Sequence, residues 1–241
     1  RASSRRASTR TPSRIRCGSR AATATSGSHP RFTIASSRAR SGSEPRTPRT
    51  RRVEDALDAL SALRRAPRDA AAVAALRAAL AAKEGAIVAK AATVAGELDV
   101  VHSDGADLVP DLRDAFHRLL EQPVKRDPGC AAKTAIASAL HRSGAYEDAL
   151  FLTGVRWVQR EPVWGGTVDV ACELRSVCAM GLLRLAHPSA ASEVAELLAD
   201  AEPAARAGAA HAIAYSEDAR FAPLLRHKIL SGDAEAQVVA E

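Results

Sequence analysis

Cysteine and histidine are the residues of this chain whose chemistry could support a metal site or a nucleophile. No two cysteines have the close spacing of paired zinc ligands, and no two histidines lie four residues apart, which would place both on one helix face. We therefore predict no metal and no cofactor. The cysteines are Cys17, Cys130, Cys172 and Cys178, and the histidines are His29, His102, His117, His141, His187, His211 and His227.

The same residues have simpler structural interpretations. We expect Cys130, Cys172 and Cys178 to be small core residues, and we expect His102, beside Asp104 and Gly105, to belong to a polar turn. So few cysteines favour a reducing compartment.

Sequence motifs of common enzyme classes are missing. The chain contains no G-x-S-x-G nucleophile turn, no phosphate-binding G-x-x-x-x-G-K-[ST] loop and no G-x-G-x-x-G dinucleotide motif. We therefore predict that the protein is not an enzyme.

Two tryptophans flank a segment that interrupts the helical pattern. Trp157 and Trp164 lie on either side of residues 159–163, with Arg156 and Arg160 close by. Tryptophan and arginine are enriched where proteins bind each other. We predict that Trp164 is exposed and binds a partner. For Trp157 two interpretations stay open, filling of the core and contact with that partner.

Helices must position these residues. From residue 53 onward, apolar residues recur at three- and four-residue spacing, and no useful alternating pattern of a strand is present. No run of 18 apolar residues could span a membrane. Breaks rich in Gly, Pro and Asp separate predicted helices at about residues 53–66, 69–83, 86–98, 107–121, 129–142, 145–159, 168–186, 189–199, 203–215, 218–230 and 233–241.

A spacing of charges repeats along these helices. Four times an acidic residue precedes a basic residue by six positions, in the pairs Glu84 and Lys90, Asp127 and Lys133, Asp169 and Arg175, and Asp200 and Arg206. Six positions after each basic residue stands a small one, namely Gly96, Ala139, Gly181 and Ala212. Small residues allow helices to approach closely, as a stack of two-helix units requires.

The pattern resembles HEAT repeats, a family of two-helix solenoids. The best match runs from Ala195 through Asp200 and Arg206 to Ile213. The resemblance implies an all-α, right-handed α-solenoid of about five helix pairs over residues 69–241, with loop insertions near residues 100–106 and 161–166. It also implies that the repeated acid and base pairs form a structural ladder between neighbouring units.

Some families with HEAT-like folds are enzymes, and this sequence lacks the features of two of them. Deoxyhypusine hydroxylase binds iron through His-Glu pairs, but no histidine here is followed by Glu. The DNA glycosylases with HEAT-like folds grip DNA with a basic, aromatic face. Residues 53–241 instead hold 20 basic and 27 acidic residues, so this activity is not expected.

The positive net charge belongs to the first 52 residues. They contain 14 Arg and one acidic residue, Glu44, among many Ser, Thr and Pro, so we predict that residues 1–52 are disordered. Three interpretations remain open: an organellar transit peptide, translated sequence ahead of a true start, and a basic arm that contacts nucleic acid or anionic lipid.

The predicted function is a non-catalytic scaffold or adaptor, monomeric and cytoplasmic, or organellar if residues 1–52 are a transit peptide. It would bind another protein on the concave solenoid face with help from residues 156–166, and there is no sign of a membrane partner. Besides the residues around the two tryptophans, Glu97, His141 and His211 are weaker candidates for this contact. The alternatives are a lyase-like or chaperone role on a cofactor-bearing protein, and nucleic-acid contact through the basic tail.

Overall fold

The structure is a computed structural model that describes residues 47–103 and 106–240. These residues belong to one unit of the chain, Pro45–Glu241. Helices dominate them: α1 (Pro48–Ala62), α2 (Ala70–Leu80), α3 (Gly85–Leu98), α4 (Val109–Leu120), α5 (Pro123–Arg126), α6 (Ala131–Ser143), α7 (Asp148–Val155), α8 (Cys172–Arg184), α9 (Ala190–Leu197), α10 (Pro203–Ser216), α11 (Ala222–Ser231) and α12 (Ala236–Ala240).

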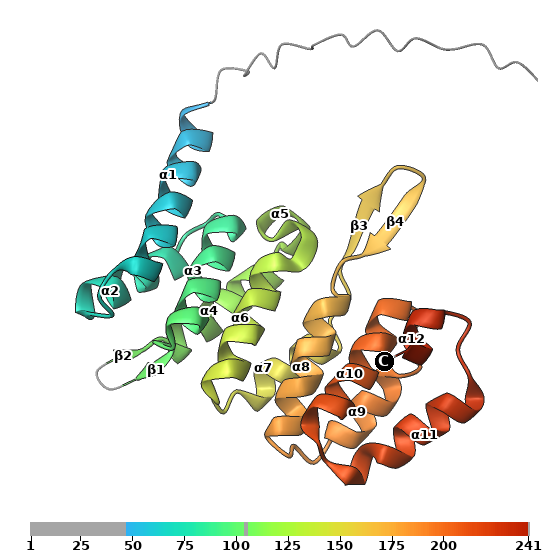
Figure 1. Ribbon diagram of the computed structural model, residues 1–241. Coiled ribbons are helices and arrows are strands. Elements are labelled where there is room, and N and C mark those ends of the chain that lie inside the picture. The colour runs from blue at the N-terminus through green and yellow to red at the C-terminus, as the bar shows by residue number, and fades with distance from the viewer. Residues whose placement is uncertain (1–46, 104–105, 241) are drawn as a thin grey trace, which may run out of the picture. The chain divides into compact units, whose positions relative to one another are not determined.

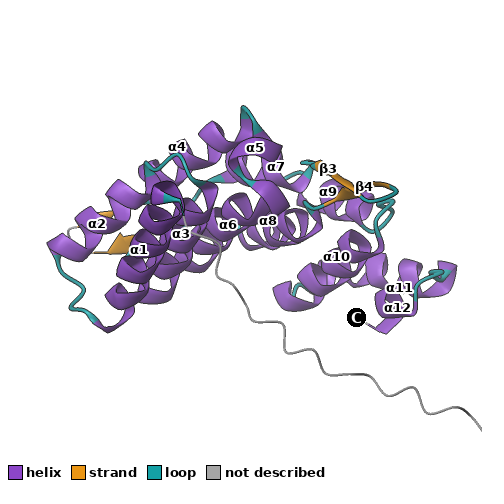
Figure 2. Cartoon of the chain, turned by 90° about the horizontal axis from the view of Figure 1, so that it is seen from above, coloured by secondary structure: helices purple, strands orange, loops and turns teal. Residues whose placement is uncertain are grey.

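The helices pack in pairs along a row. Helices α1, α3, α6, α8 and α10 follow one another in the row, each in contact with the next (Figure 1). The other helices cover this row, with α2 on α3, α4 on α6, α7 on α8 and α9 on α10 (Figure 2). Helices α11 and α12 both pack against α10. The described residues thus form four helix pairs, preceded by α1 and followed by α11 and α12, with the short α5 between α4 and α6.

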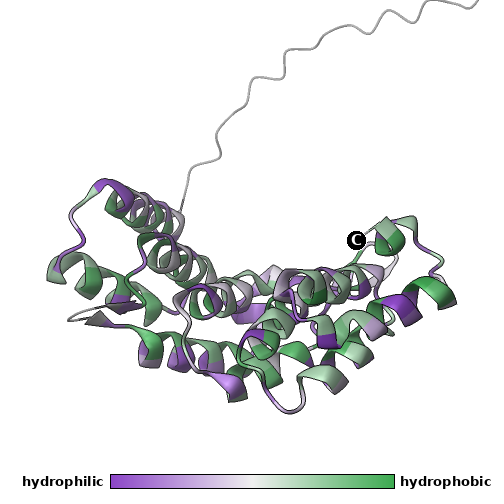
Figure 3. Cartoon of the chain, turned by 60° about the horizontal axis from the view of Figure 1, so that its bottom comes forward, coloured by the Kyte–Doolittle hydropathy of each residue, from purple (hydrophilic) through white to green (hydrophobic). Residues whose placement is uncertain are grey.

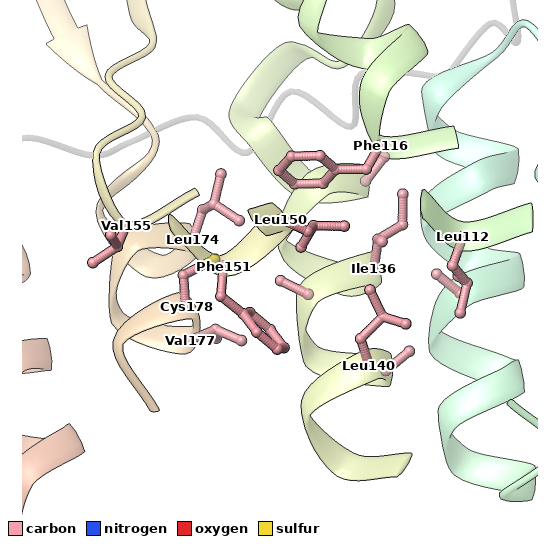
Figure 4. Packing of buried hydrophobic residues seen from close by; sticks show 14 of the residues in the cluster. Leu112, Phe116, Ile136, Leu140, Leu150, Phe151, Val155, Leu174, Val177 and Cys178 are labelled. Atoms are coloured by element: carbon pink, nitrogen blue, oxygen red, sulfur yellow. The ribbon is translucent and has the colours of Figure 1, made fainter. Parts of the chain in front are cut away.

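The core lies between the helices of the row and their partners. In Figure 4, Phe116 of α4, Ile136 of α6 and Phe151 of α7 lie among leucines of the neighbouring helices. The close approach of neighbouring helices depends on the small residues predicted at positions 96 and 181. A Cβ added at Gly96 would lie 3.2 Å from the Cα of Ala139, and one at Gly181 would lie 2.6 Å from the Phe151 ring. Figure 3 shows hydrophobic residues both in the helices of the row and in the helices that cover it. Within residues 47–103 and 106–240, no helix is long and apolar enough to cross a membrane.

The first helix begins earlier than predicted. Residues 48–52, which the sequence assigns to the disordered tail, form the first turns of α1. Pro48 suits the first helical turn because its missing N–H has no partner there, and the Thr47 hydroxyl accepts a hydrogen bond from the N–H of Thr50 at 3.3 Å. The remaining tail, residues 1–46, lies outside the described residues, as does Cys17.

Two antiparallel hairpins correct the expectation of a body without strands. The first joins β1 (His102–Ser103) to β2 (Ala106–Asp107), and the second joins β3 (Arg160–Val163) to β4 (Gly166–Asp169). They occupy the two segments predicted as loop insertions. The predicted helices 145–159 and 168–186 are correspondingly shorter, as α7 and α8. Residues 104–105, part of the predicted turn beside His102, lie outside the described residues.

Candidate functional site

The hairpin β3–β4 carries the fully exposed Trp164 and stands away from the helices (Figure 1). Val163 pairs with Gly166, so Trp164 and Gly165 form the turn between the strands. Gly165 has a φ of 88°, which glycine adopts without the steric cost that other residues meet. The local sequence therefore places the tryptophan at the tip of the hairpin.

Buried hydrogen bonds hold the base of this hairpin. Gln159, only 2% exposed, donates through Nε2 to the carbonyl oxygen of Asp127 at 2.8 Å and to the Glu161 carboxylate at 2.7 Å. The same Glu161 oxygen accepts from the N–H of Gly129 at 2.8 Å. The hairpin is thus tied to the segment between α5 and α6, which is remote in sequence.

Asp169 fixes the other strand. Its carboxylate accepts from the N–H groups of Gln159 and Ala171, each at 3.0 Å, and from Arg175 at 2.6 Å. Burial acts to raise the pKa of Asp169, but these hydrogen bonds outweigh it and hold the pKa below its ordinary value. A charged carboxylate therefore joins the hairpin to α8.

Two exposed valines share one face of the hairpin. Directly paired residues share a face and successive residues alternate, so Val163 and Val168 lie on the same face. Glu161, which pairs with Val168, also lies on this face, and its carboxylate is bound by Gln159 and Gly129. Val163 is 50% exposed, Val168 43% and Trp164 104%. The three exposed apolar residues Val163, Val168 and, in the turn, Trp164 are together called the hairpin face below. Such a surface can bury an apolar segment of another molecule, and an outer strand edge can pair with an extended chain.

The residues predicted beside the hairpin have different environments. Arg156 forms two hydrogen bonds with the buried carboxylate of Glu193, one of them at 2.8 Å, and so links α7 to α9. Trp157 is half-buried against the core, with the Lys133 Nζ 6.0 Å from its ring centroid. Arg160 is exposed and pairs with no described acidic residue. Trp157 thus packs against the core with part of its side chain exposed.

The weaker candidates lie elsewhere in the row. Glu97 of α3 is held by Arg64, which donates to it at 2.9 Å. His141 of α6 and His211 of α10 both contact the Tyr215 ring, with centroid distances of 5.9 and 6.4 Å. Burial, together with two nearby arginines, lowers the pKa of His141. The structure brings the two histidines around one ring, away from the hairpin tip.

Two of the four predicted acid and base pairs form ion pairs. Lys133 Nζ lies 2.8 Å from Asp127, and Arg175 Nη1 lies 2.6 Å from Asp169, all four side chains being buried. Arg175 also reaches Asp200 of the next unit at 3.3 Å. This last contact joins α8 to the segment that follows α9.

The ladder differs from prediction at both ends. Glu84 pairs with Arg49 of α1 at 3.3 Å because α1 packs beside α3, and Lys90 forms no ion pair with any described residue. Arg206 donates to the backbone carbonyl of Asp200 and forms its ion pair with Asp233, at 2.7 Å. The charge spacing does not predict Asp233 as a partner of Arg206. A signal is nevertheless present, because Asp233 follows the helix break at residues 231–232, the kind of position that the acidic residues of the repeated pairs occupy.

Burial raises the pKa of each described cysteine. Cys130 and Cys178 are buried, and burial raises the pKa of Cys130 to about 12 and that of Cys178 further. Cys172 is half-buried and its pKa is also raised, first of all by burial. Protonated thiols are poor nucleophiles. Within residues 47–103 and 106–240, no group of three His, Cys, Asp or Glu could hold a metal ion.

Comparison with known proteins adds no relative. No family model, no curated protein and no solved structure matches this chain.

Proposed function

We propose that this protein is a right-handed, HEAT-like α-solenoid that serves as a non-catalytic scaffold or adaptor and binds a partner protein through the hairpin face. The observation that carries the proposal is a fully exposed tryptophan at the tip of a hairpin whose base is held by buried polar groups. Because the scaffold is already ordered, binding there costs little conformational entropy.

The arrangement of the helices supports the scaffold part of the proposal. Successive pairs repeat the same contacts, and the links from Arg175 to Asp200 and from Arg206 to Asp233 join neighbouring units. Repeats that bury their apolar faces only against neighbours form extended surfaces, which such proteins use for binding.

The chemistry of the hairpin face defines the occupant. Two valines and a tryptophan favour an extended segment with apolar side chains, and the unpaired strand edges offer main-chain hydrogen bonds to it. Removal of a tryptophan at the centre of such a contact costs at least about 2 kcal/mol, or roughly thirtyfold in affinity.

Photo-crosslinking from the two faces of β4 tests the proposal. A photo-reactive phenylalanine analogue is placed at Val168, on the hairpin face, or at the adjacent Thr167, on the opposite face, of the full chain in cells of its source. We expect one protein to crosslink from position 168 and not from position 167. Trp164→Ala should abolish this product, and Tyr146→Ala, which removes an aromatic residue 73% exposed elsewhere, should leave it unchanged. Equal products from both faces, or a product that survives Trp164→Ala, would contradict the proposal.

A further inference from the structure

A cationic cavity lies near the other end of the described chain, where α4, α5 and the segment between α2 and α3 meet the start of α1. Its volume is about 500 Å³. Its charged lining consists of five basic side chains, Arg49, Lys83, Arg118, Lys125 and Arg126, with no carboxylate among the lining residues. The hairpin face contributes nothing to it, so its role is separate from the proposed function.

Close packing of backbone brings these charges together. A Cβ at Gly85, the first residue of α3, would overlap the carbonyl oxygen of Arg126, so glycine allows the end of α5 to lie against α3. Arg118 donates to the Leu80 carbonyl oxygen at 2.6 Å, and Arg126 donates to the Arg118 carbonyl oxygen at 2.9 Å. These bonds fix the two guanidinium groups in the cavity wall.

The positive charge of the cavity is only partly balanced. Arg49 pairs with Glu84 at 3.3 Å and Arg126 with Glu121 at 2.9 Å, both from outside the lining. Lys83 and Lys125 are exposed, and their ammonium groups form no ion pair or hydrogen bond with any described residue. An anionic ligand would therefore find two ammonium groups that have no competing partner.

We propose that this cavity binds a carboxylate-rich peptide segment of another protein. The cations come from separate elements around the cavity, which suits several carboxylates spaced along a flexible chain. Arg118 and Arg126 each donate to one carbonyl oxygen and keep further N–H groups, which suffice for hydrogen bonds to carboxylates of such a segment. No aromatic side chain lines the cavity, so a nucleic acid would lack the stacking that single strands need.

Zero-length crosslinking locates the ligand directly. The full chain is mixed with an N-acetylated oligoglutamate peptide and a carbodiimide, which joins a carboxylate to a lysine amine, and the products are mapped by mass spectrometry. The chain has five lysines and none lies within residues 1–52, so an amide on a lysine side chain cannot come from the arginine-rich tail. We expect Lys83 and Lys125 to be the main products, with Lys90 and Lys228 as internal controls. Labelling of Lys90 as strong as that of Lys83 would overturn the proposal.

Charge reversal supplies a matched control. The double variant Lys83→Glu and Lys125→Glu should lower the affinity for the labelled peptide at least tenfold, measured by fluorescence anisotropy. Arg65→Glu with Arg68→Glu makes the same change in net charge at two exposed residues outside the cavity, and should lower it far less. Equal losses would refute the site. So would a single-stranded oligonucleotide that blocks labelling of Lys83 and Lys125 at the same concentration as the unlabelled peptide.

Discussion

The buried pair of Lys133 and Asp127 makes the strongest prediction about stability. Lys133 is 0% exposed and Asp127 1%, and Nζ lies 2.8 Å from the carboxylate. Lys133→Met keeps the length of the side chain but leaves a buried carboxylate without its cation. Breaking a buried pair in this way costs about 3–5 kcal/mol. Two N–H groups, of Ala132 and Lys133, still donate to Asp127 at 2.7 and 3.1 Å, so the lower end of that range applies.

Urea unfolding of the full chain, followed by circular dichroism, measures this cost. With an m value of about 2 kcal/mol/M, a loss of about 3 kcal/mol moves the midpoint down by roughly 1.5 M. The double variant Asp127→Asn with Lys133→Met removes both charges, and should be more stable than Lys133→Met alone. A change below about 0.5 kcal/mol in Lys133→Met, or a double variant less stable than that single variant, would refute the view that this pair is buried and coupled.

Three further predictions follow from the same contacts. Because the pKa of Asp169 is depressed in the folded state, its contribution to stability is present above the ordinary carboxylate pKa and is lost as the pH falls through the folded value. The unfolding free energies of wild type and Asp169→Asn should therefore converge in acid. Curves of unfolding free energy against pH that stay parallel would be evidence against the hydrogen bonds described. Because burial raises their pKa, Cys130 and Cys178 should resist iodoacetamide at pH 8 in the native protein and react once urea unfolds it. Mass spectrometry of peptides measures the labelling, and labelling of either cysteine in the native protein would contradict this prediction. Gly181→Ala should destabilise the fold by about 1–2 kcal/mol in urea unfolding, since the clash with the buried Phe151 ring exceeds the gain in helix propensity, and a more stable variant would show that the ring can move.

The sequence predicts the helices well because their ends depend on local signals. Pro203 begins α10 as expected, and Gly144 ends α6 with a φ of 76°. The small residues at positions 96 and 181 likewise lie at close helix contacts. Such features are decided by a few neighbouring residues, so one sequence is enough to find them.

The features that the sequence misses depend on remote contacts. Residues 160–169 look like a loop because they contain a proline and two glycines, and the hairpin is held by a hydrogen bond from Gln159 to the distant Asp127. The partner of Glu84 is Arg49, from a helix whose packing beside α3 the charge spacing does not reveal. The cationic cavity also combines four separate elements, and so no short motif predicts it.

Quenching of Trp164 fluorescence tests the central claim most directly. The chain contains two tryptophans, so Trp157→Phe leaves Trp164 as the single emitter at the hairpin tip. In the free protein, acrylamide should quench this emission almost as strongly as that of free tryptophan, because the side chain is fully exposed. With the crosslinked partner, once identified, added in saturating amount in a form without tryptophan, quenching should fall severalfold. Undiminished quenching in the saturated complex would contradict the claim that the partner binds at the hairpin face.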